Sequence, residues 1–282
     1  MGNRYGFGFS ECKRKTGNPL SFVNIGILNT TKGNLSKKDG TFTLKIENIS
    51  NSDTIRFSYI GYETLKKSVK EVKAESNIIL SPNKIELDEI TVEAKRYDKI
   101  IRIGNDYRRR GGTAFLGWSE GEELGGIIEI NKPVQVLTAN FKIESISGDS
   151  LHFRLNIYDY KDGKIGDNLL NKNIYIHEKQ KVGILTKNIS DLSLILKNDV
   201  LLALEYIYID GNEAGKPDST FLFRFRKNRS NGILYRDQEK SNNIQNEFRK
   251  INNTVLQFYL ETIINNSESQ TVALILCYKL KL

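Results

Sequence analysis

The sequence contains few of the residue types that build small chemical centres. Its 282 residues include two cysteines, two histidines, one tryptophan and four prolines. The two cysteines, Cys12 and Cys277, are far apart in the chain, which excludes a disulfide framework and a cysteine metal knuckle. A single bridge between the two ends stays open, and two free thiols are the favoured interpretation.

Long apolar runs are also missing. No stretch of eighteen apolar residues occurs, so the sequence predicts no transmembrane segment. The N-terminus, MGNRYGFGFSECKRK, has no apolar core ahead of its charges and does not read as a signal peptide. We therefore expect either a cytoplasmic protein or one whose leader is absent from this sequence.

The formal charge is +8, which raises a nucleic-acid-binding interpretation. The basic residues are scattered, however, and the densest runs, at 13–15 and at Arg108, Arg109 and Arg110, are only three residues long. Scattered lysines on strands are typical of solvated surfaces with protected sheet edges. We expect no nucleic-acid partner, and basic nucleic-acid binding is kept as an alternative.

The hydrophobic pattern predicts an all-β protein. Residues 20–28, 37–46, 54–62 and 77–82 alternate apolar and polar positions between turns, and Asp39-Gly40 is typical of a tight turn. A weak helical pattern occurs only at 66–75. After a charged segment at 94–104, about eight further strand-like stretches alternate with Gly-, Asp- and Asn-rich turns, which favours a β-sandwich or jelly roll.

The front of the chain also carries a set of family motifs. TGNPL, KKDGTFTL and SYIGY occur in order and, together with Gly33, supply thirteen matching positions: Thr16, Gly17, Pro19, Leu20, Gly33, Asp39, Gly40, Phe42, Leu44, Ser58, Tyr59, Gly61 and Tyr62. Residues 7–95 thus resemble the carboxypeptidase-regulatory-like domain, a transthyretin-like (prealbumin-like) β-sandwich common in Gram-negative cell-envelope proteins. The stretch FGFSECKR alternates less cleanly than the first strand of that family.

The resemblance implies an architecture for the rest of the chain. This domain often precedes the plug and barrel of TonB-dependent receptors, but the remaining residues are too few for a barrel of roughly 22 strands. FRLNIYDYKDGKIGDNLL, 153–170, instead resembles a jelly-roll module. We expect a carboxypeptidase-regulatory-like sandwich at 1–95, a linker at 96–110 and a jelly-roll-like β-sandwich at 111–282.

Two sequence patterns suggest catalysis. GWSEG matches the nucleophile elbow with Ser119 as nucleophile, but Gly125 and Gly126 would break the helix that must follow. His152 and His177 are the only histidines that could assist it, and neither stands in a zinc-peptidase motif. We expect no enzyme and no cofactor, and a serine hydrolase using Ser119 is the disfavoured alternative.

Other residues suggest ligand binding. Asp159, Asp162 and Asp167 could hold calcium, although a hairpin turn at Asp162 is favoured and no metal site is expected. The aromatic residues that could stack on a ligand are Trp118, Tyr206 and Tyr208. The competing interpretation is that these aromatics pack in a core, as aromatics in alternating strands usually do.

In the stretch FSYIGYE, an inward face of Ile55, Phe57 and Tyr59 is expected, with Gly61 relaxing the backbone where the strand bends. This glycine is therefore interpreted as a packing device and not as part of a binding platform.

Together these patterns predict a non-enzymatic binding or scaffolding protein. The resemblance implies a cell-envelope location, periplasmic or associated with the outer membrane. We expect the C-terminal sandwich to recognise an envelope protein or a glycan, and the residues leave the choice and the oligomeric state open.

Overall fold

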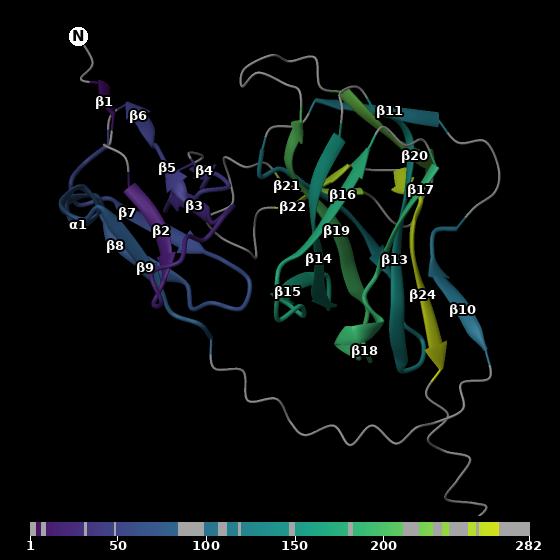
Figure 1. The fold of residues 1–282 in the computed structure, drawn as a ribbon. Coiled ribbons are helices and arrows are strands. Elements are labelled where there is room, and N and C mark those ends of the chain that lie inside the picture. The colour runs from purple at the N-terminus through teal and green to yellow at the C-terminus, as the bar shows by residue number, and fades with distance from the viewer. Residues whose placement is uncertain are drawn as a thin grey trace, which may run out of the picture.

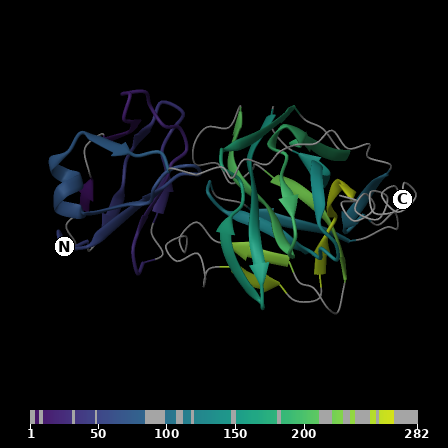
Figure 2. The same cartoon turned by 90° about the horizontal axis from the view of Figure 1, so that it is seen from below.

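The computed structural model describes residues 4–6, 10–30, 33–47, 49–83, 99–106, 112–117, 120–146, 150–179, 183–210, 220–227, 233–236, 248–251 and 254–264. Two β-rich domains lie side by side, the N-terminal one purple to blue and the C-terminal one teal to yellow (Figure 1). The view from below shows the same separation (Figure 2). The fold is all-β, as the alternation predicts.

The described residues of the N-terminal domain form three small sheets. The largest has the order β4 (Gly33–Leu35), β3 (Asn24–Ile27), β7 (Thr54–Ser58), β8 (Leu65–Ser68). A second has the order β5 (Thr41–Phe42), β2 (Ser10–Arg14), β9 (Asn77–Leu80), and β1 (Arg4–Gly6) pairs with β6 (Lys45–Glu47). The pairing of β2 with β9 is parallel, whereas the other pairings are antiparallel.

The core of this domain follows the predicted inward face. Ile55 and Phe57 are fully buried, and Tyr59 packs against the same cluster. The rings of Phe42 and Phe57 meet edge to face at 5.6 Å, an arrangement that aromatic pairs prefer. Alternation in β7 thus places one face of the strand in the core.

In the described part of the chain a short helix, α1 (Val69–Ala74), occupies the stretch with the weak helical pattern. The Ser68 side chain accepts a hydrogen bond from the Glu71 amide, and the Glu71 carboxylate accepts one from the Ser68 amide. This capping box satisfies two backbone donors that a helix start otherwise leaves open. Val69 and Val72, three positions apart, face the core together.

The C-terminal domain contains two larger sheets. The eight-stranded sheet has the order β10 (Ile100–Gly104), β24 (Phe258–Ile264), β13 (Val134–Ile146), β20 (Thr220–Lys227), β11 (Gly112–Gly117), with β17 (Gly183–Asn188) and β18 (Ile195–Leu196) on β13 and β23 (Thr254–Leu256) on β20. The seven-stranded sheet has the order β15 (Lys164–Asn168), β14 (Ser150–Lys161), β19 (Val200–Asp210), β12 (Glu123–Ile128), β21 (Ile233–Arg236), β22 (Phe248–Ile251), with β16 (Ile174–Lys179) on β14. A 3-10 turn, η1, spans Ser190–Leu192.

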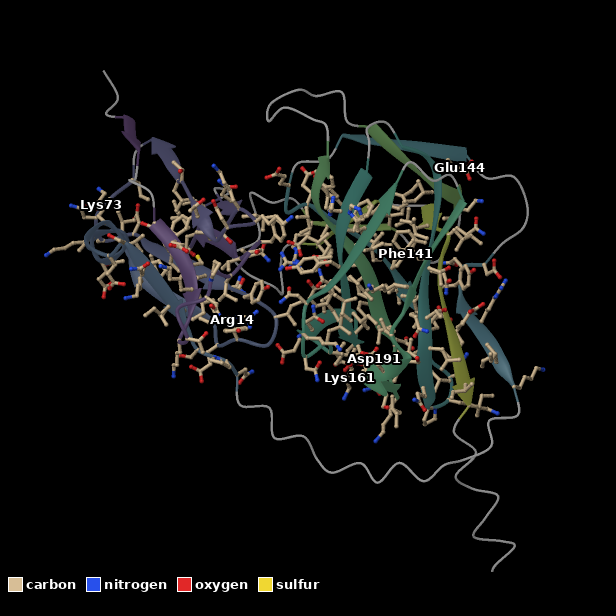
Figure 3. The ribbon with its side chains drawn as sticks, viewed as in Figure 1. Arg14, Lys73, Phe141, Glu144, Lys161 and Asp191 are labelled. Carbon is tan, nitrogen blue, oxygen red and sulfur yellow. The ribbon has the colours of Figure 1, made fainter. Side chains whose placement is uncertain are left out.

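The two sheets enclose one apolar core, which makes this domain a β-sandwich. Phe153, Leu155 and Ile157 of β14 are fully buried in it. Phe141 of β13 lies in the same interior, with its ring 4.7 Å from that of Phe258 (Figure 3). Because side chains alternate along a strand, the intervening residues of β14 point to the opposite face of its sheet.

Strand β10 lies inside the range expected to be a linker. Its five residues pair antiparallel with β24, from Ile100 opposite Ile263 to Gly104 opposite Tyr259. Ile101 and Ile103 pack against the sandwich core. The alternating stretch IIRIG is short and lies among charged residues, so this strand could not be predicted from the sequence pattern.

Within the described residues, no helix is long and apolar enough to cross a membrane.

Candidate functional site

The face of the seven-stranded sheet opposite the core carries a buried set of polar side chains. We call this set the polar network; its members are Glu123, Arg154, Asn156, Tyr158, Asn168, Glu205 and Arg236. Adjacent strands bring these residues together, because Arg154 of β14 and Glu123 of β12 both stand opposite Glu205 of β19. On an ordinary solvent-exposed face of a sheet, charged side chains are hydrated, whereas most of the charged side chains in this network are buried.

Arg154 and Glu205 form the centre of the network. The Arg154 Nε and Nη2 atoms donate to the two Glu205 oxygens, both at 2.8 Å. The Arg154 side chain is 1% exposed and that of Glu205 is 2% exposed. Burial is the largest single influence and would lower the pKa of Arg154, but the charge and hydrogen bonds of Glu205, together with Tyr175 and Tyr59, outweigh it and the pKa is raised. This two-pronged pairing is the geometry for which guanidinium is suited.

A second ion pair lies beside the first. Arg236 donates to Glu123, and its Nη2 also donates to the Tyr158 hydroxyl at 2.9 Å. Asn156 donates to Glu123 at 2.7 Å and to Glu205 at 3.3 Å, which joins the two pairs. Burial raises the pKa of Glu123, and Arg236 acts in the opposite direction.

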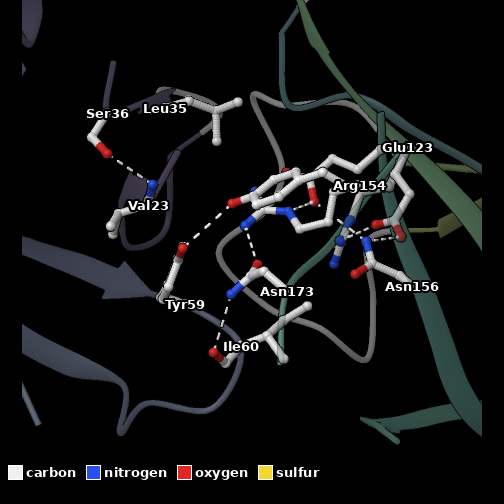
Figure 4. Close-up of polar contacts among 12 residues, drawn as sticks. Val23, Leu35, Ser36, Tyr59, Ile60, Glu123, Arg154, Asn156 and Asn173 are labelled. Atoms are coloured by element: carbon white, nitrogen blue, oxygen red, sulfur yellow. Dashed lines mark hydrogen bonds and ion pairs between the residues drawn. The ribbon is translucent and has the colours of Figure 1, made fainter. Parts of the chain in front are cut away.

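The network contacts the N-terminal domain through Asn173. Arg154 Nη1 donates to Asn173 Oδ1 at 2.9 Å, and Asn173 Nδ2 donates to the Ile60 carbonyl oxygen at 3.2 Å (Figure 4). Ile60 itself packs against the core of the second domain. A continuous set of hydrogen bonds thus runs from the Glu205 carboxylate to the backbone of the other domain.

Aromatic rings complete this contact. The Tyr59 and Tyr175 hydroxyls lie 3.4 Å apart, and the Phe22 ring meets the Tyr175 ring edge to face at 5.7 Å. Phe22 has a φ of +59°, a conformation rare for a bulky residue. Burial raises the pKa of Tyr175, so the hydroxyl stays protonated in this contact. We call the surface formed by Phe22, Tyr59, Ile60 and Gly61 on one side and by Asn171, Asn173 and Tyr175 on the other the domain contact.

Gly61 packs directly against the backbone of the second domain. Its φ is +81°, and a Cβ atom there would lie 2.5 Å from the Asn171 carbonyl oxygen. The expectation that Gly61 lies at a bend after the strand is confirmed, since residues 60 and 61 form a turn and its φ is positive. The backbone that a side chain there would meet, however, belongs to the second domain. The sequence offered no signal for this, since Asn171 is more than a hundred residues away.

A pocket opens at a different edge of the sandwich, beside β10. Its volume is about 660 Å³. Five of its lining residues are aliphatic: Ile101, Ile103, Ile127, Val134 and Ile264. Five are polar: Arg102, Asn105, Glu129, Asn131 and Lys132. The aliphatic residues are buried or half-buried and four of the five polar ones are exposed, so the pocket has an apolar floor and a polar rim.

The predicted ligand-stacking residues have separate outcomes. Tyr206 is 6% exposed and packs in the core, with its ring 6.2 Å from that of Phe153, so it offers no surface for stacking. Tyr208 belongs to β19, but its side chain lies outside the described residues. Trp118 and Ser119 of the GWSEG motif, and the basic run 108–110, also lie outside them. Those predictions stay untested.

The predicted calcium residues surround a hairpin turn. Asp162 and Gly163 have φ values of +51° and +77° and connect β14 to β15, as in a two-residue hairpin with left-handed central positions. Asp162 and Asp167 are exposed, and Asp159 is half-buried. No group of three potential metal-binding His, Cys, Asp or Glu side chains gathers anywhere in the described part of the chain.

The two histidines, considered above only as partners of Ser119, stand directly opposite each other. His152 of β14 pairs in register with His177 of β16. Their ring centroids are 4.1 Å apart. Sequence reasoning missed this pair, because the register between two strands 25 positions apart is not visible in the residues.

Cys12 is a free, fully buried thiol in the core of the N-terminal domain. Burial raises its pKa, and the neighbouring Glu11 adds to the effect. Cys277 lies outside the described residues.

Comparison with known proteins identifies the front of the chain. No curated protein is significantly similar to this sequence. A family model, however, matches residues 12–92, and its description is CarboxypepD_reg-like domain. The match contains the sheets that surround Phe57 and the loop that carries Gly61. Residues 12–92 are therefore a CarboxypepD_reg-like domain, joined in this chain to a second β-sandwich.

Proposed function

We propose that this chain is a non-enzymatic binding protein of the cell envelope that recognises an extended segment of a protein partner through its C-terminal sandwich. The observation that carries the proposal is the pocket beside β10, with its aliphatic floor and polar rim. The envelope location is inferred from the family resemblance of residues 12–92. The partner itself is proposed by chemical class only.

The edge of the sheet supports an extended partner. Among the described strands, β10 pairs only with β24, so its other edge has no strand beside it. An extended peptide can add to such an edge through main-chain hydrogen bonds, while alternate side chains enter neighbouring pockets. Ile100 on this strand is 63% exposed and, although it does not line the pocket, it offers an apolar side chain at the same open edge.

The lining favours a protein segment over a glycan. Sugar rings are usually bound by stacking on aromatic side chains, and none of the described residues that line the pocket is aromatic. Aliphatic floors suit aliphatic side chains, and the charges of Lys132 and Glu129 at the rim suit polar groups of a peptide. The pocket is also on a different edge from the domain contact, so the N-terminal domain leaves it accessible.

A photo-crosslinking amino acid at position 132 tests the proposal in cells that make the protein. We expect discrete adducts with one or a few envelope proteins, identified by mass spectrometry, and loss of these adducts when Ile100→Lys is added. The matched control is the same amino acid at exposed position 164, in β15 at the far end of the other sheet.

Equal adducts at positions 132 and 164 would contradict recognition by the pocket. Recovery of the mature protein in the cytosolic fraction would contradict the envelope location. If the protein binds an array of glycans saturably, and Ile100→Lys abolishes this binding, the partner is a glycan and not a protein.

A further inference from the structure

We propose that His152 and His177 form a two-imidazole site for a divalent transition-metal ion, with Cu²⁺ as the preferred ion. The two residues are all the histidines of the chain, and the antiparallel register of β14 and β16 places them opposite each other. This inference is independent of the proposed function.

The distance between the rings fits a shared metal ion. His177 Nδ1 lies 2.9 Å from His152 Nε2 and 3.1 Å from His152 Nδ1. Imidazole nitrogens bind such ions at about 2.0–2.1 Å, so two of them at a right angle around one ion are separated by about 2.9 Å. A tetrahedral angle gives about 3.3 Å by the same geometry. The side chains therefore already have the spacing of two neighbouring ligands.

The contact also makes a lone pair available. Two nitrogens at this distance cannot both carry a proton that points at the other, so at least one of them acts as an acceptor. Because His177 Nδ1 is nearly equidistant from the two nitrogens of the His152 ring, it lies over the face of that ring, and a shared metal ion requires the rings to rotate until their lone pairs converge. Neutral imidazole is the form that binds metal ions.

The pair is reachable from solvent. His177 is exposed and His152 is half-buried, and β16 has β14 as its only neighbour among the described strands. Two side chains leave the remaining coordination positions to water, since the described residues contain no group of three suitable ligands. Imidazole ligands suit Cu²⁺, Ni²⁺ and Zn²⁺, and the general affinity order places Cu²⁺ first.

The adjacent position in the register is part of the domain contact. Arg154 stands opposite Tyr175 on the same two strands, two residues along from the histidines and on the same face. Strands β14 and β16 are thus held in place by the contacts of Arg154 and Tyr175 with Asn173 and Tyr59. A ligand pair on fixed strands loses less freedom on binding than one on a loop.

Titration of the untagged full-length protein with Cu²⁺, followed by electron paramagnetic resonance, tests the site. We expect one ion per chain, with nitrogen couplings from two imidazoles. His152→Gln and His177→Gln should each weaken binding on the order of tenfold or more and remove the two-nitrogen signal. Thermal unfolding shows whether each variant keeps the fold.

Cys12→Ala is the matched control and should leave the copper signal unchanged, because this thiol is fully buried. Zn²⁺ and Ni²⁺ should compete with Cu²⁺, whereas Ca²⁺ and Mg²⁺ should not. A two-nitrogen signal that persists in either folded histidine variant, or a wild-type protein that binds Cu²⁺ without nitrogen coupling, would overturn the proposal.

Discussion

The α-carbon of Gly61 faces the carbonyl oxygen of Asn171 so closely that a methyl group there would lie 2.5 Å from that oxygen. The two residues belong to different domains, and the contact is to backbone, which cannot rotate away as a side chain can. A glycine inside the SYIGY motif thus fixes how near the front domain comes to the sandwich.

Gly61→Ala should therefore weaken the domain contact. A positive φ alone costs about 1 kcal/mol with alanine, and the clash with Asn171 adds to this. Gly17→Ala is the matched control, since Gly17 has a φ of +87° in the same domain and open space around it. We expect a larger loss of unfolding free energy for Gly61→Ala in denaturant titrations, and a larger radius of gyration by X-ray scattering. Equal losses of unfolding free energy in the two variants would show that the second domain does not contact residue 61 closely.

Glu205→Gln should destabilise the fold by about 3–5 kcal/mol, because it leaves Arg154 buried without its charge partner. Arg154→Met should do the same from the other side. The double variant should lose less than the sum of the single losses, because no unpaired charge then remains. Chemical unfolding of the four proteins measures this coupling, and strict additivity would mean that the pair contributes through packing alone.

Asn173→Ala removes the link between Arg154 and the Ile60 carbonyl group. We expect a loss of about 1–3 kcal/mol, because the two partners are left without this amide. Asn171→Ala is the control, since the exposed Asn171 contributes its backbone carbonyl to the contact with Gly61, and alanine retains that group. Similar unfolding curves for the two variants would contradict a role for the Asn173 side chain in joining the domains.

Stability should fall at alkaline pH, in part through Cys12. Its pKa in the folded protein is raised above the ordinary value of 9.0. Below that value both states keep the proton, whereas above it the unfolded chain loses the proton and the folded one does not. Each further pH unit then costs up to about 1.4 kcal/mol.

Cys12→Ala should lower the unfolding free energy at every pH, since it leaves a cavity, but its loss between about pH 8 and pH 10 should be shallower than in the wild type. Denaturant titrations across this range provide the comparison. Parallel pH profiles would mean that Cys12 ionises in the folded state as readily as in the unfolded one.

Alternation predicted strands such as β7 and β14, because a strand with one buried face repeats every two residues. Ile55 and Phe57 in β7 and Phe153, Leu155 and Ile157 in β14 follow this rule. Turn chemistry located Asp39-Gly40 and Asp162-Gly163, since both turns need positive φ values at or next to the aspartate. These local signals also predicted an all-β fold.

The polar network could not be predicted in the same way. Arg154, Asn156 and Tyr158 alternate with core residues and therefore look like a solvated face, yet all three are buried. Their burial depends on partners such as Glu205 and Arg236, which reach them only through the pairing of β14, β19, β12 and β21. The pairing of His152 with His177 is hidden for the same reason.

The hydrogen bond from Asn173 to Ile60 bears on how such chains can be recombined. A front module grafted from another protein would have to offer an accessible carbonyl group opposite Asn173 and a residue without a side chain opposite Asn171. Modules that share only the sheet architecture would not form the domain contact. Successful chimaeras therefore need the loop at 59–61 transplanted back, or the facing segment at 171–175 exchanged together with the module.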